Sequence, residues 1–557
     1  MCGIIGSNFL TSNFDETINL LYHRGPDVQG SFTYKNNQFG HTRLSIIDLN
    51  EEASQPMIFD DIIITFNGEI YNYKELIEEE KLNCKTKSDT EVLIRLYQKY
   101  GVDFLNKLNG MFSFCIFDIK KEQFFCARDR FGKKPFYFYY KDDKFIYASE
   151  IKSIISLLSF TPTLNKKALE EYLTFWSPIG TNTFYKDILK LEAGYSIVFD
   201  GKKLLKNKYY DIDKIDLIHE SEENVLDNIE NLLIKSMERR LVSDVGVASL
   251  LSGGVDSSLV SSLYSKISLS KIDTYCIGYD EHVHYSELPY ARKVAKYINS
   301  NHHEVLIGRN DFLEVIDNML THMDEPIGDS ASIPTYILSK QISKDGFKVA
   351  LSGEGSDEIF LGYDKYFNLL KTDSTYTTIN ASFSEEEKIK LFNEYLKKDY
   401  SSLSPYNSRI QNLSYLDIKI WIGDVLMTKI DKMSMAHSLE LRAPFLDYHL
   451  VEYLLSIDES LKVGNTNKYL LKQIAYKYLP KDIVDRKKKG FSSPFIEWLY
   501  EEFKDEILNV ILRVNRHLNL FNEEYVKFLY NEAKEKRYKQ HVWNLFIFSR
   551  WFERVYL

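Results

Sequence analysis

The residues best suited to chemistry stand at the start of the chain, in Met1-Cys2-Gly3-Ile4-Ile5-Gly6. Removal of Met1 would make Cys2 the first residue, so that one residue would carry both a thiol and a free α-amino group. Such an amine titrates at about pH 7.7 to 8.0 and can act as base for the thiol. We expect Gly3 to leave room for a substrate carbonyl beside the sulfur. From these six residues alone, an ordinary cysteine near a frayed terminus is the better interpretation.

Polar clusters further along the chain supply what a thiol needs to hydrolyse the amide of glutamine. Asn67 and Gly68 offer a side-chain amide and a backbone N–H to a developing oxyanion. Free glutamine also carries a carboxylate and an ammonium, which Arg43 and Asp89 are suited to bind. Each cluster alone has a plainer explanation, because Asn-Gly is a common turn and a single Arg is often a weak surface ion pair. Together with Cys2, they predict a glutaminase site.

A second set of candidates is a glycine turn, Ser252-Gly253-Gly254-Val255-Asp256-Ser257-Ser258. An apolar run precedes it and residues with helical spacing follow, which predicts a buried strand, a turn and a helix start. Backbone N–H groups at such a helix start bind phosphate. A lone Gly-Gly is usually a plain turn, whereas the full string is more specific. No Gly-Lys-Ser/Thr follows, so the turn is not a Walker loop.

A third set is an acidic glycine turn, Ser352-Gly353-Glu354-Gly355-Ser356-Asp357-Glu358, which follows a later apolar run. Because parallel strands end at the same edge of a sheet, we expect Asp256 and Asp357 to share Mg²⁺ with pyrophosphate oxygens. Independent surface loops are the alternative. Lys468 and the run from Lys487 to Gly490 would offset charge on departing pyrophosphate, although a charge run is usually just a solvated face. The basic run Arg486-Lys487-Lys488-Lys489 could meet one small anion.

The elements that must position these residues divide the chain in two. In the first part, strands are expected at residues 30–34, 38–42, 62–66, 110–117 and 135–140, and helices at 73–80 and 88–100. Ser88 is the predicted N-cap of the second helix, with Glu91 completing a capping box. In the second part, apolar runs at 245–251, 271–278, 303–307 and 347–351 alternate with helical patterns, which predicts a parallel sheet. We assign residues 2–195 and 226–557 to two domains and 196–225 to a packed linker.

Composition narrows the class of protein. A chain of 557 residues with 44% hydrophobic and 27% charged residues is typical of a globular protein with two or more domains. The net charge of −10 argues against nucleic acid as a partner. We find neither a leader pattern nor an apolar stretch of the ~18 to 20 residues that a membrane span needs. Five cysteines without metal-ligand spacing fit a reducing cytoplasm.

The motifs of the first part resemble the class II glutaminase family. The matching segments are Met1-Cys2-Gly3-Ile4, His23-Arg24-Gly25-Pro26-Asp27, Asn67-Gly68-Glu69-Ile70-Tyr71-Asn72 and Arg128-Asp129-Arg130-Phe131-Gly132-Lys133-Lys134-Pro135. The resemblance implies an N-terminal nucleophile hydrolase, an α+β sandwich with αββα layers. It implies that Cys2 is the nucleophile, that Asn67 and Gly68 form the oxyanion hole, and that Arg43, Glu69 and Asp89 hold glutamine. Residues 23–27 would be a structural and gating loop.

The glycine turn of the second part resembles the pyrophosphate loop of ATP pyrophosphatases, an α/β fold. Both parts together are similar to glutamine-hydrolysing asparagine synthetases, and residues 428–447 resemble the helical segment that closes over substrate in that family. The resemblance implies that ATP adenylates the side-chain carboxylate of aspartate. Ammonia freed from glutamine at Cys2 would then pass through an internal tunnel and attack, giving asparagine, AMP and pyrophosphate.

The same resemblance implies roles for residues of the second part. Glu354 would assist the attack of ammonia as base or orienting group, and Asp256 and Asp357 would hold Mg²⁺. The residues implied in binding ATP and pyrophosphate are Leu251, Ser252, Gly253, Gly254, Asp256, Ser257, Ser258, Ile277, Ser352, Gly353 and Lys468. Members of the family often form homodimers.

Three alternatives stay open at this point. The same two-site layout could amidate another carboxylate, such as a sugar acid in surface-polysaccharide assembly, with acceptor contacts within residues 324–334. A β-lactam synthetase shares the architecture but does not need the thiol, so intact Cys2, Arg43, Asn67 and Asp89 argue against it. A non-enzymatic nutrient sensor or scaffold should have eroded motifs, whereas both sets are complete here.

Overall fold

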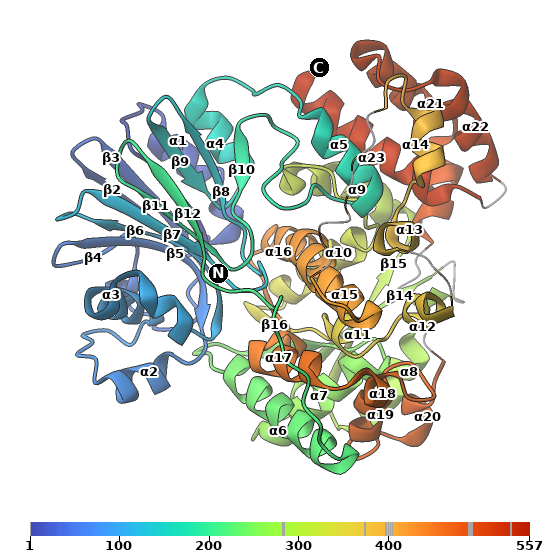
Figure 1. Cartoon of the computed structure of the whole chain (residues 1–557), viewed down its shortest axis with the longest axis horizontal. Coiled ribbons are helices and arrows are strands. Elements are labelled where there is room, and N and C mark those ends of the chain that lie inside the picture. The colour runs from blue at the N-terminus through green and yellow to red at the C-terminus, as the bar shows by residue number, and fades with distance from the viewer. Residues whose placement is uncertain are drawn as a thin grey trace.

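The structure is a computed structural model of the chain, and it describes residues 2–280, 285–371, 375–395, 398, 400, 403, 405–487, 494–534 and 537–557. Figure 1 shows two halves side by side. One half consists mainly of the early strands, coloured blue to green, and the other consists mainly of helices from the second half of the chain. Among the described residues, no helix combines the length and apolarity needed to cross a membrane.

Two antiparallel six-stranded sheets form the N-terminal half. Their orders are β10-β8-β9-β1-β3-β2 and β12-β11-β7-β6-β5-β4. The strands are β1 (Cys2–Ser7), β2 (Val28–Tyr34), β3 (Asn37–Arg43), β4 (Met57–Phe59), β5 (Ile62–Ile70), β6 (Gly110–Asp118), β7 (Gln123–Arg128), β8 (Tyr137–Lys141), β9 (Lys144–Ala148), β10 (Ile188–Lys190), β11 (Tyr195–Phe199) and β12 (Leu204–Lys208). Buried aromatic rings such as Phe39, Phe117 and Phe124 pack together between strands of both sheets, which is how such residues stabilise a sandwich.

Short helices flank these sheets: α1 (Phe14–Asn19), α2 (Tyr73–Glu80), α3 (Asp89–Tyr100) and α4 (Ile151–Leu158). Helix α5 (Lys166–Phe175) lies instead among the helices of the other half, where the hydroxyl of Tyr172 donates to the carbonyl of Asn544 (Figure 1). Ser88 caps α3 as predicted, because its side chain accepts a hydrogen bond from the N–H of Thr90. The predicted capping box is wrong. The N–H of Ser88 donates to the hydroxyl of Thr86, and Glu91 accepts instead from the N–H groups of Lys85 and Thr86, so it stabilises the turn before the helix.

A parallel five-stranded sheet organises the C-terminal half. Its order is β15-β14-β13-β16-β17, with β13 (Val247–Leu250), β14 (Asp273–Tyr279), β15 (Asn301–Ile307), β16 (Val349–Leu351) and β17 (Glu440–Arg442). Because β13 and β16 are neighbours in parallel register, the two glycine turns that follow them lie at the same edge of the sheet. The predicted combination of an antiparallel sandwich and a parallel α/β sheet is confirmed.

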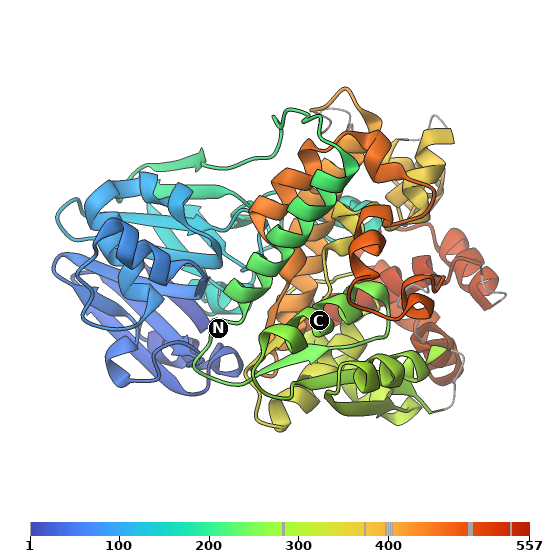
Figure 2. The same ribbon diagram turned by 90° about the horizontal axis from the view of Figure 1, so that it is seen from below.

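Helices cover this sheet and form the rest of the half. They include α6 (Glu222–Arg240), α7 (Val255–Ile267), α8 (Leu288–Tyr297), α9 (Arg309–Met323), α10 (Ser332–Lys344), α11 (Ser356–Ile359), α12 (Asp364–Lys371), α15 (Arg409–Leu416), α16 (Met427–Met435), α17 (Tyr448–Ser456), α19 (Tyr469–Ala475), α20 (Lys481–Val484), α21 (Phe495–Leu518) and α23 (Lys539–Tyr556). Figure 2 shows the long α6 in green on the side of this half that faces the sheets. Its Arg240 lies 4.8 Å from the ring of Tyr71 in the first half.

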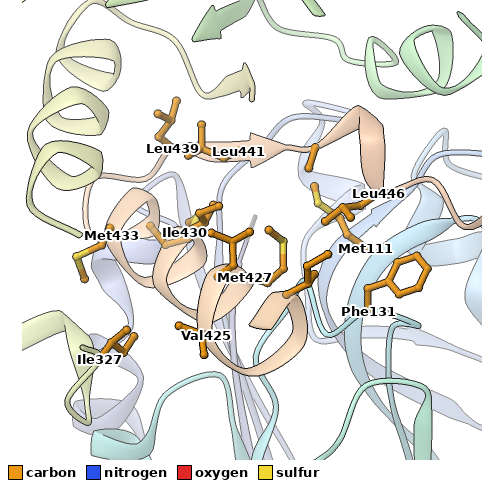
Figure 3. Close-up of a cluster of buried hydrophobic side chains, with 14 of the residues drawn as sticks. Met111, Phe131, Ile327, Val425, Met427, Ile430, Met433, Leu439, Leu441 and Leu446 are labelled. Atoms are coloured by element: carbon orange, nitrogen blue, oxygen red, sulfur yellow. The ribbon is translucent and has the colours of Figure 1, made fainter. Parts of the chain in front are cut away.

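Helix α16 is the centre of the contact between the halves. Its Asp431 pairs with Arg24 at 2.9 Å and with Lys134 at 3.1 Å, and all three side chains are buried. Apolar side chains of the helix and of its neighbours form one cluster. In Figure 3, Met427, Ile430 and Met433 belong to α16, and the other labelled residues are Met111 and Phe131 of the first half and Ile327, Val425, Leu439, Leu441 and Leu446 of the second. The two halves therefore share one buried, partly charged interface.

The segment between the halves begins as part of a sheet. Strands β11 and β12 pair with each other, and β11 also pairs with β7. Residues 195–208, most of which lie in the stretch interpreted as linker, thus extend the second sheet of the sandwich. The next helix, α6, begins at Glu222.

Candidate active sites

Cys2 opens β1 and lies opposite Arg43 of β3 in the sheet register. Its backbone is fixed on both sides, because its N–H donates to Asn67 Oδ1 at 3.0 Å and its carbonyl accepts from Arg24 Nε at 3.1 Å. We expected Gly3 to leave room for a substrate carbonyl beside the sulfur, and this expectation is wrong. A Cβ there would lie 2.6 Å from Thr42 Oγ1 and 2.7 Å from Leu21 Cβ, so the glycine permits close packing and the space is not open to substrate.

The environment of the Cys2 thiol favours its neutral form. Burial raises the pKa of this thiol, and only 7% of the residue is exposed. A thiol must lose its proton to attack an amide, so this one needs a base beside it. An α-amino group freed by removal of Met1 would be such a base.

Asn67 and Gly68 sit side by side on β5, next to Cys2. Because Asn67 Oδ1 is already bonded to the N–H of Cys2, its Nδ2 group is left over, and this buried donor has no hydrogen-bond partner in the part of the chain described. An unsatisfied buried donor is costly, and an oxyanion would satisfy it. A Cβ at Gly68 would lie 2.1 Å from the carbonyl oxygen of Met111, so no other residue fits there.

The residues predicted to hold glutamine surround one pocket. Arg43, Glu69 and Asp89 line it together with Cys2 and Gly68. The guanidinium of Arg43 donates to backbone carbonyls, including that of Asn50 at 2.9 Å. These bonds hold the cation at the pocket wall.

Two carboxyl groups of this pocket, those of Glu69 and Asp89, have raised pKa values. Burial raises the pKa of Glu69 well above its usual range and that of Asp89 to about 6, and the neighbouring Glu440 raises both further. Glu69 Oε2 has no partner among the described residues, and the Arg442 guanidinium is 3.8 Å from the other oxygen. A bound ammonium would supply a further positive charge.

The first glycine turn connects β13 to α7 and is held by its own hydroxyls. Ser252 Oγ and Ser257 Oγ lie 2.9 Å apart, and the N–H of Gly254 donates to Ser252 Oγ at 3.3 Å. Gly253 has a φ of +77°, and a Cβ there would lie 2.6 Å from the backbone nitrogen of Ala291 on α8. The turn thus presents the N-terminus of α7, a suitable place for phosphate.

Lys468 joins the two glycine turns. Its Nζ lies 2.6 Å from both oxygens of Asp256 and 2.7 Å from Asp357 Oδ1. The turns also touch directly, because Ser356 Oγ donates to Asp256 Oδ1 at 2.8 Å. The structure therefore brings together the two carboxylates that we expected to share a metal, with a lysine ammonium between them.

These groups fit Mg²⁺ in their chemistry. Asp256 and Asp357 offer oxygen ligands that converge on one point, now taken by Lys468 Nζ. The described residues contain no group of three or more protein ligands for a metal. Mg²⁺ commonly binds through one or two carboxylates and completes its shell with phosphate oxygens and water.

Glu354 lies beside this group. Burial raises the pKa of its carboxyl, Lys429 opposes this, and Asp329, Asp357 and Asp256 add to it. Lys429 Nζ is 2.8 Å from Asp329 Oδ2. A second lysine–carboxylate pair therefore stands next to Glu354, on α16 and on the loop after α9.

Comparison with known proteins agrees with this two-site geometry. The family model described as asparagine synthase matches residues 228–553, and the one described as glutamine amidotransferase domain matches residues 1–210. This chain belongs to the asparagine synthase family.

Similar relatives include "Asparagine synthetase (glutamine-hydrolyzing) 1" of Bacillus subtilis strain 168, 31% identical over 99% of this chain and 96% of that protein. A putative asparagine synthetase (glutamine-hydrolyzing) 2 of Methanocaldococcus jannaschii is 37% identical over 67% of this chain and 78% of its own. "Amidase chry2" of Gibberella zeae is 25% identical over 91% of this chain and 88% of that protein. The resemblance to glutamine-hydrolysing asparagine synthetases is confirmed.

The remaining predicted ATP residues of this asparagine synthase domain line the sheet edge. Leu251 is buried and its N–H donates to the carbonyl of Tyr275 at 2.8 Å, while Ile277 is buried in β14. A Cβ at Gly353 would lie 2.9 Å from the nitrogen of Ser257, so the two turns pack closely. Ser258 Oγ is buried without a hydrogen-bond partner in the described chain.

Of the stretch expected to contact the acceptor, only part reaches this site. Asp324 bonds Lys432 and the N–H of Ile151, and Glu325 accepts from the N–H of Phe184 at 3.0 Å, so both stabilise the contact between the halves. Asp329, through Lys429, is the member of the stretch that lies near Glu354.

The sequence did not mark two cations of the synthetase site. Lys429 lies on α16, within the stretch 428–447 that resembles the segment closing over substrate, but the sequence analysis gave it no role of its own. Arg486 was noted only as part of a basic run, yet its Nη1 donates to the carbonyl of Gly253 at 3.2 Å. Lys488 and Lys489 of that run, and Gly490 after it, lie outside the described residues.

Proposed function

We propose that this chain converts L-aspartate to L-asparagine with ATP, using ammonia from glutamine and releasing glutamate, AMP and pyrophosphate. The names of two similar relatives, both glutamine-hydrolysing asparagine synthetases, support this reaction. The observation that carries it is a buried bridge between the sites: Arg24 touches both the carbonyl of Cys2 and Asp431 of α16. Asp431 lines a cavity with Ser352, which is two residues from Glu354.

In the glutaminase site, Cys2 is the nucleophile. Its freed α-amino group takes the thiol proton, and the thiolate attacks the side-chain amide of glutamine. Asn67 Nδ2 and the N–H of Gly68 then bind the oxyanion. Arg43 holds the carboxylate of glutamine and Asp89, with Glu69, holds its ammonium. The amine proton passes to the leaving nitrogen, and water releases glutamate from the sulfur.

In the synthetase site, the N-terminus of α7 and the hydroxyls of Ser252, Ser257 and Ser258 bind phosphate oxygens, and Leu251, Ile277, Ser352 and Gly353 lie against the nucleotide. Asp256 and Asp357 would hold Mg²⁺, which offsets phosphate charge when bound. The aspartate carboxylate forms a bond to the α-phosphorus as the bond to pyrophosphate breaks. Lys468 stabilises the charge of departing pyrophosphate. Ammonia then forms a bond to the acyl carbon, the bond from that carbon to the AMP oxygen breaks, and Glu354 accepts the proton that the nitrogen loses.

The acceptor site suits an α-amino acid. A zwitterion needs one cation for its carboxylate and one anion for its ammonium, and Lys429 and Asp329 present such a pair beside Glu354. A sugar acid carries no ammonium and would offer Asp329 no second positive charge beside that of Lys429. This pair therefore favours aspartate over the sugar-acid alternative.

We further propose that the glutaminase domain is residues 2–195 and the synthetase domain residues 226–557, with 196–225 as a packed linker whose first hairpin extends the sandwich. The five cysteines are all free, which suits the reducing cytoplasm as the place of the reaction. The homodimer that the resemblance implies stays a prediction.

The test is a product assay with a panel of acceptors. The enzyme with glutamine and ATP is given aspartate, glutamate or a sugar acid, and pyrophosphate, AMP and amide product are measured. Of the three acceptors, we expect only aspartate to react, and to give asparagine, AMP and pyrophosphate in equal amounts. Pyrophosphate release with a sugar acid but not with aspartate, or formation of ADP, would contradict the proposal.

A further inference from the structure

A cavity lies where the two halves meet. Apolar side chains form part of its wall, namely Met111, Met427, Ile430 and Leu441, which Figure 3 shows on α16 and beside it. Its polar lining consists of Lys133, Lys134, Ser352, Asp431 and Ser434. At one end of the cavity, Asp431 pairs with Arg24, which contacts Cys2. At the other end, Ser352 belongs to the glycine turn that carries Glu354.

Two hydroxyls of this lining are unsatisfied. Ser352 Oγ and Ser434 Oγ are buried and have no hydrogen-bond partner in the described part of the chain. Buried hydroxyls without partners indicate that a small polar molecule belongs there. Ammonia fits, because it can donate to both hydroxyl oxygens.

Lys133 faces this cavity with an unusual set of partners. Its Nζ donates to the carbonyls of Gly110 and Leu446, at 3.2 and 3.1 Å, and to no carboxylate within the described residues. Burial lowers the pKa of Lys133 to about 7, with Asp129 and Asp447 opposing this and Arg240 and Arg130 adding to it. A lysine ammonium and a free ammonium are the same kind of ion, so the surroundings of Lys133 disfavour both.

The other charges of the lining leave it positive. Asp431 is its only carboxylate among the described residues, and it pairs with two cations, Arg24 and Lys134. Although burial opposes them, these two cations hold the pKa of Asp431 below its usual range. Arg24 does not line the cavity and is itself paired with Glu150 at 3.0 Å, so the charged groups of the lining are two lysines, Lys133 and Lys134, and one carboxylate. A further cation in the cavity is repelled, whereas a neutral molecule is not.

We propose that Lys133 and Lys134 form a filter that passes ammonia as the neutral molecule and excludes ammonium on the way from Cys2 to Glu354. A lysine ammonium only donates hydrogen bonds. Ammonia accepts one through its lone pair, whereas ammonium has no lone pair and carries a like charge. The same lysines that admit the nucleophile therefore reject its unreactive form. This inference rests on the proposed function, which supplies the ammonia.

The test compares Lys133→Met with the unsubstituted enzyme. Met keeps the length of the side chain and removes its charge. With glutamine as nitrogen donor, glutamate and asparagine are measured at a pH below about 7, where Lys133 carries its charge, and at a pH above the pKa of ammonium. For the unsubstituted enzyme, the ratio of glutamate formed to asparagine formed should be near one at both pH values. In Lys133→Met we expect the ratio to rise about tenfold at the lower pH only, since one unit charge at contact distance in a protein changes the population of a second cation by at least that factor.

Further variants separate the filter from a structural role. Lys133→Gln keeps a donor for the two carbonyls and loses the charge, so it should show the same pH-dependent loss even where Lys133→Met folds poorly. Lys133→Arg keeps the charge and should keep the ratio near one. Lys141→Met, at an exposed lysine of β8, is the control for losing a lysine elsewhere. A cavity that merely leaks would raise the ratio equally at both pH values, which would contradict the filter.

The outcomes also separate this inference from the proposed function. A ratio that stays near one at low pH in Lys133→Met and Lys133→Gln would overturn the filter and leave the amidation intact. If the unsubstituted enzyme formed glutamate but no asparagine, the amidation itself would be wrong and the filter would fall with it.

Discussion

The two active sites of this chain differ in how their charges are balanced. In the glutaminase pocket, the buried polar atoms Asn67 Nδ2 and Glu69 Oε2 have no hydrogen-bond partner among the described residues. In the synthetase site, each carboxylate that we assign to metal or acceptor holds a lysine: Asp256 and Asp357 share Lys468, and Asp329 pairs with Lys429. The first site is ready for its ligand, whereas the second must exchange internal ion pairs for ligand contacts.

The difference has a physical origin in the elements that carry the residues. Cys2 lies within β1, and Asn67 and Gly68 lie within β5. Because the strands fix the backbone at these positions, their unsatisfied polar atoms cannot move to reach another hydrogen-bond partner. The synthetase residues lie on turns after strands and on α16, where long lysine side chains reach across and neutralise acids. Substitutions should therefore act differently in the two sites.

The largest effect should come from breaking the paired site. Asp357→Ala removes one of the two carboxylates that pair with Lys468, and with it a carboxylate assigned to Mg²⁺. We expect aspartate-dependent pyrophosphate release to fall about 10³-fold, which corresponds to about 4 kcal/mol. Glutamine hydrolysis should remain. Asp364→Ala, at an exposed aspartate of α12, is the matched control, and a normal rate in Asp357→Ala would remove this residue from the mechanism.

In the unpaired site, Asn67→Ala should affect only the glutamine reaction. Loss of one donor to an oxyanion lowers kcat by about 10² to 10³-fold. Asparagine formation from free ammonia is the internal control and should be unchanged. An equal fall in both reactions would show that Asn67 stabilises the fold and does not serve the oxyanion.

Asp89→Asn should weaken glutamine binding more than chemistry. The variant keeps the shape of the side chain and removes the charge that meets the ammonium. We expect KM for glutamine to rise about 10 to 100-fold, the usual worth of a hydrogen bond to a charged group, with kcat little changed. A fall in kcat at constant KM would assign Asp89 to catalysis.

A smaller effect should appear in the pH dependence of the unsubstituted enzyme. Because burial raises the pKa of Asp89 to about 6, the carboxyl gains a proton as the pH falls through that value. Glutamine binds the ionised form, so KM for glutamine should rise progressively below about pH 6 and be flat above it. The ammonia-dependent reaction, with KM expressed per neutral ammonia, should show no such step near pH 6. A flat profile for glutamine would show that Asp89 does not meet the ammonium.

The sequence predicted those parts of the sites that local motifs define. Cys2, Asn67-Gly68 and both glycine turns follow from residue types at short spacing, and the strand and helix patterns place them on the observed elements. Lys429 and Asp329 are about a hundred residues apart and meet only through packing of α16 on the loop after α9, which no local pattern reveals. Lys133 was part of a recognised motif, but its place in a cavity depends on the contact between the halves. The role expected of Gly3 failed for the same reason, since Thr42 and Leu21 fill the space beside it.

The central claim is that the Cys2 thiol supplies nitrogen to a distant acceptor site in the same chain. The most direct measurement is asparagine formation by Cys2→Ala with either glutamine or ammonia as donor. We predict that glutamine-dependent synthesis is lost while ammonia-dependent synthesis stays at the level of the unsubstituted enzyme. Full glutamine-dependent activity in Cys2→Ala would contradict the account.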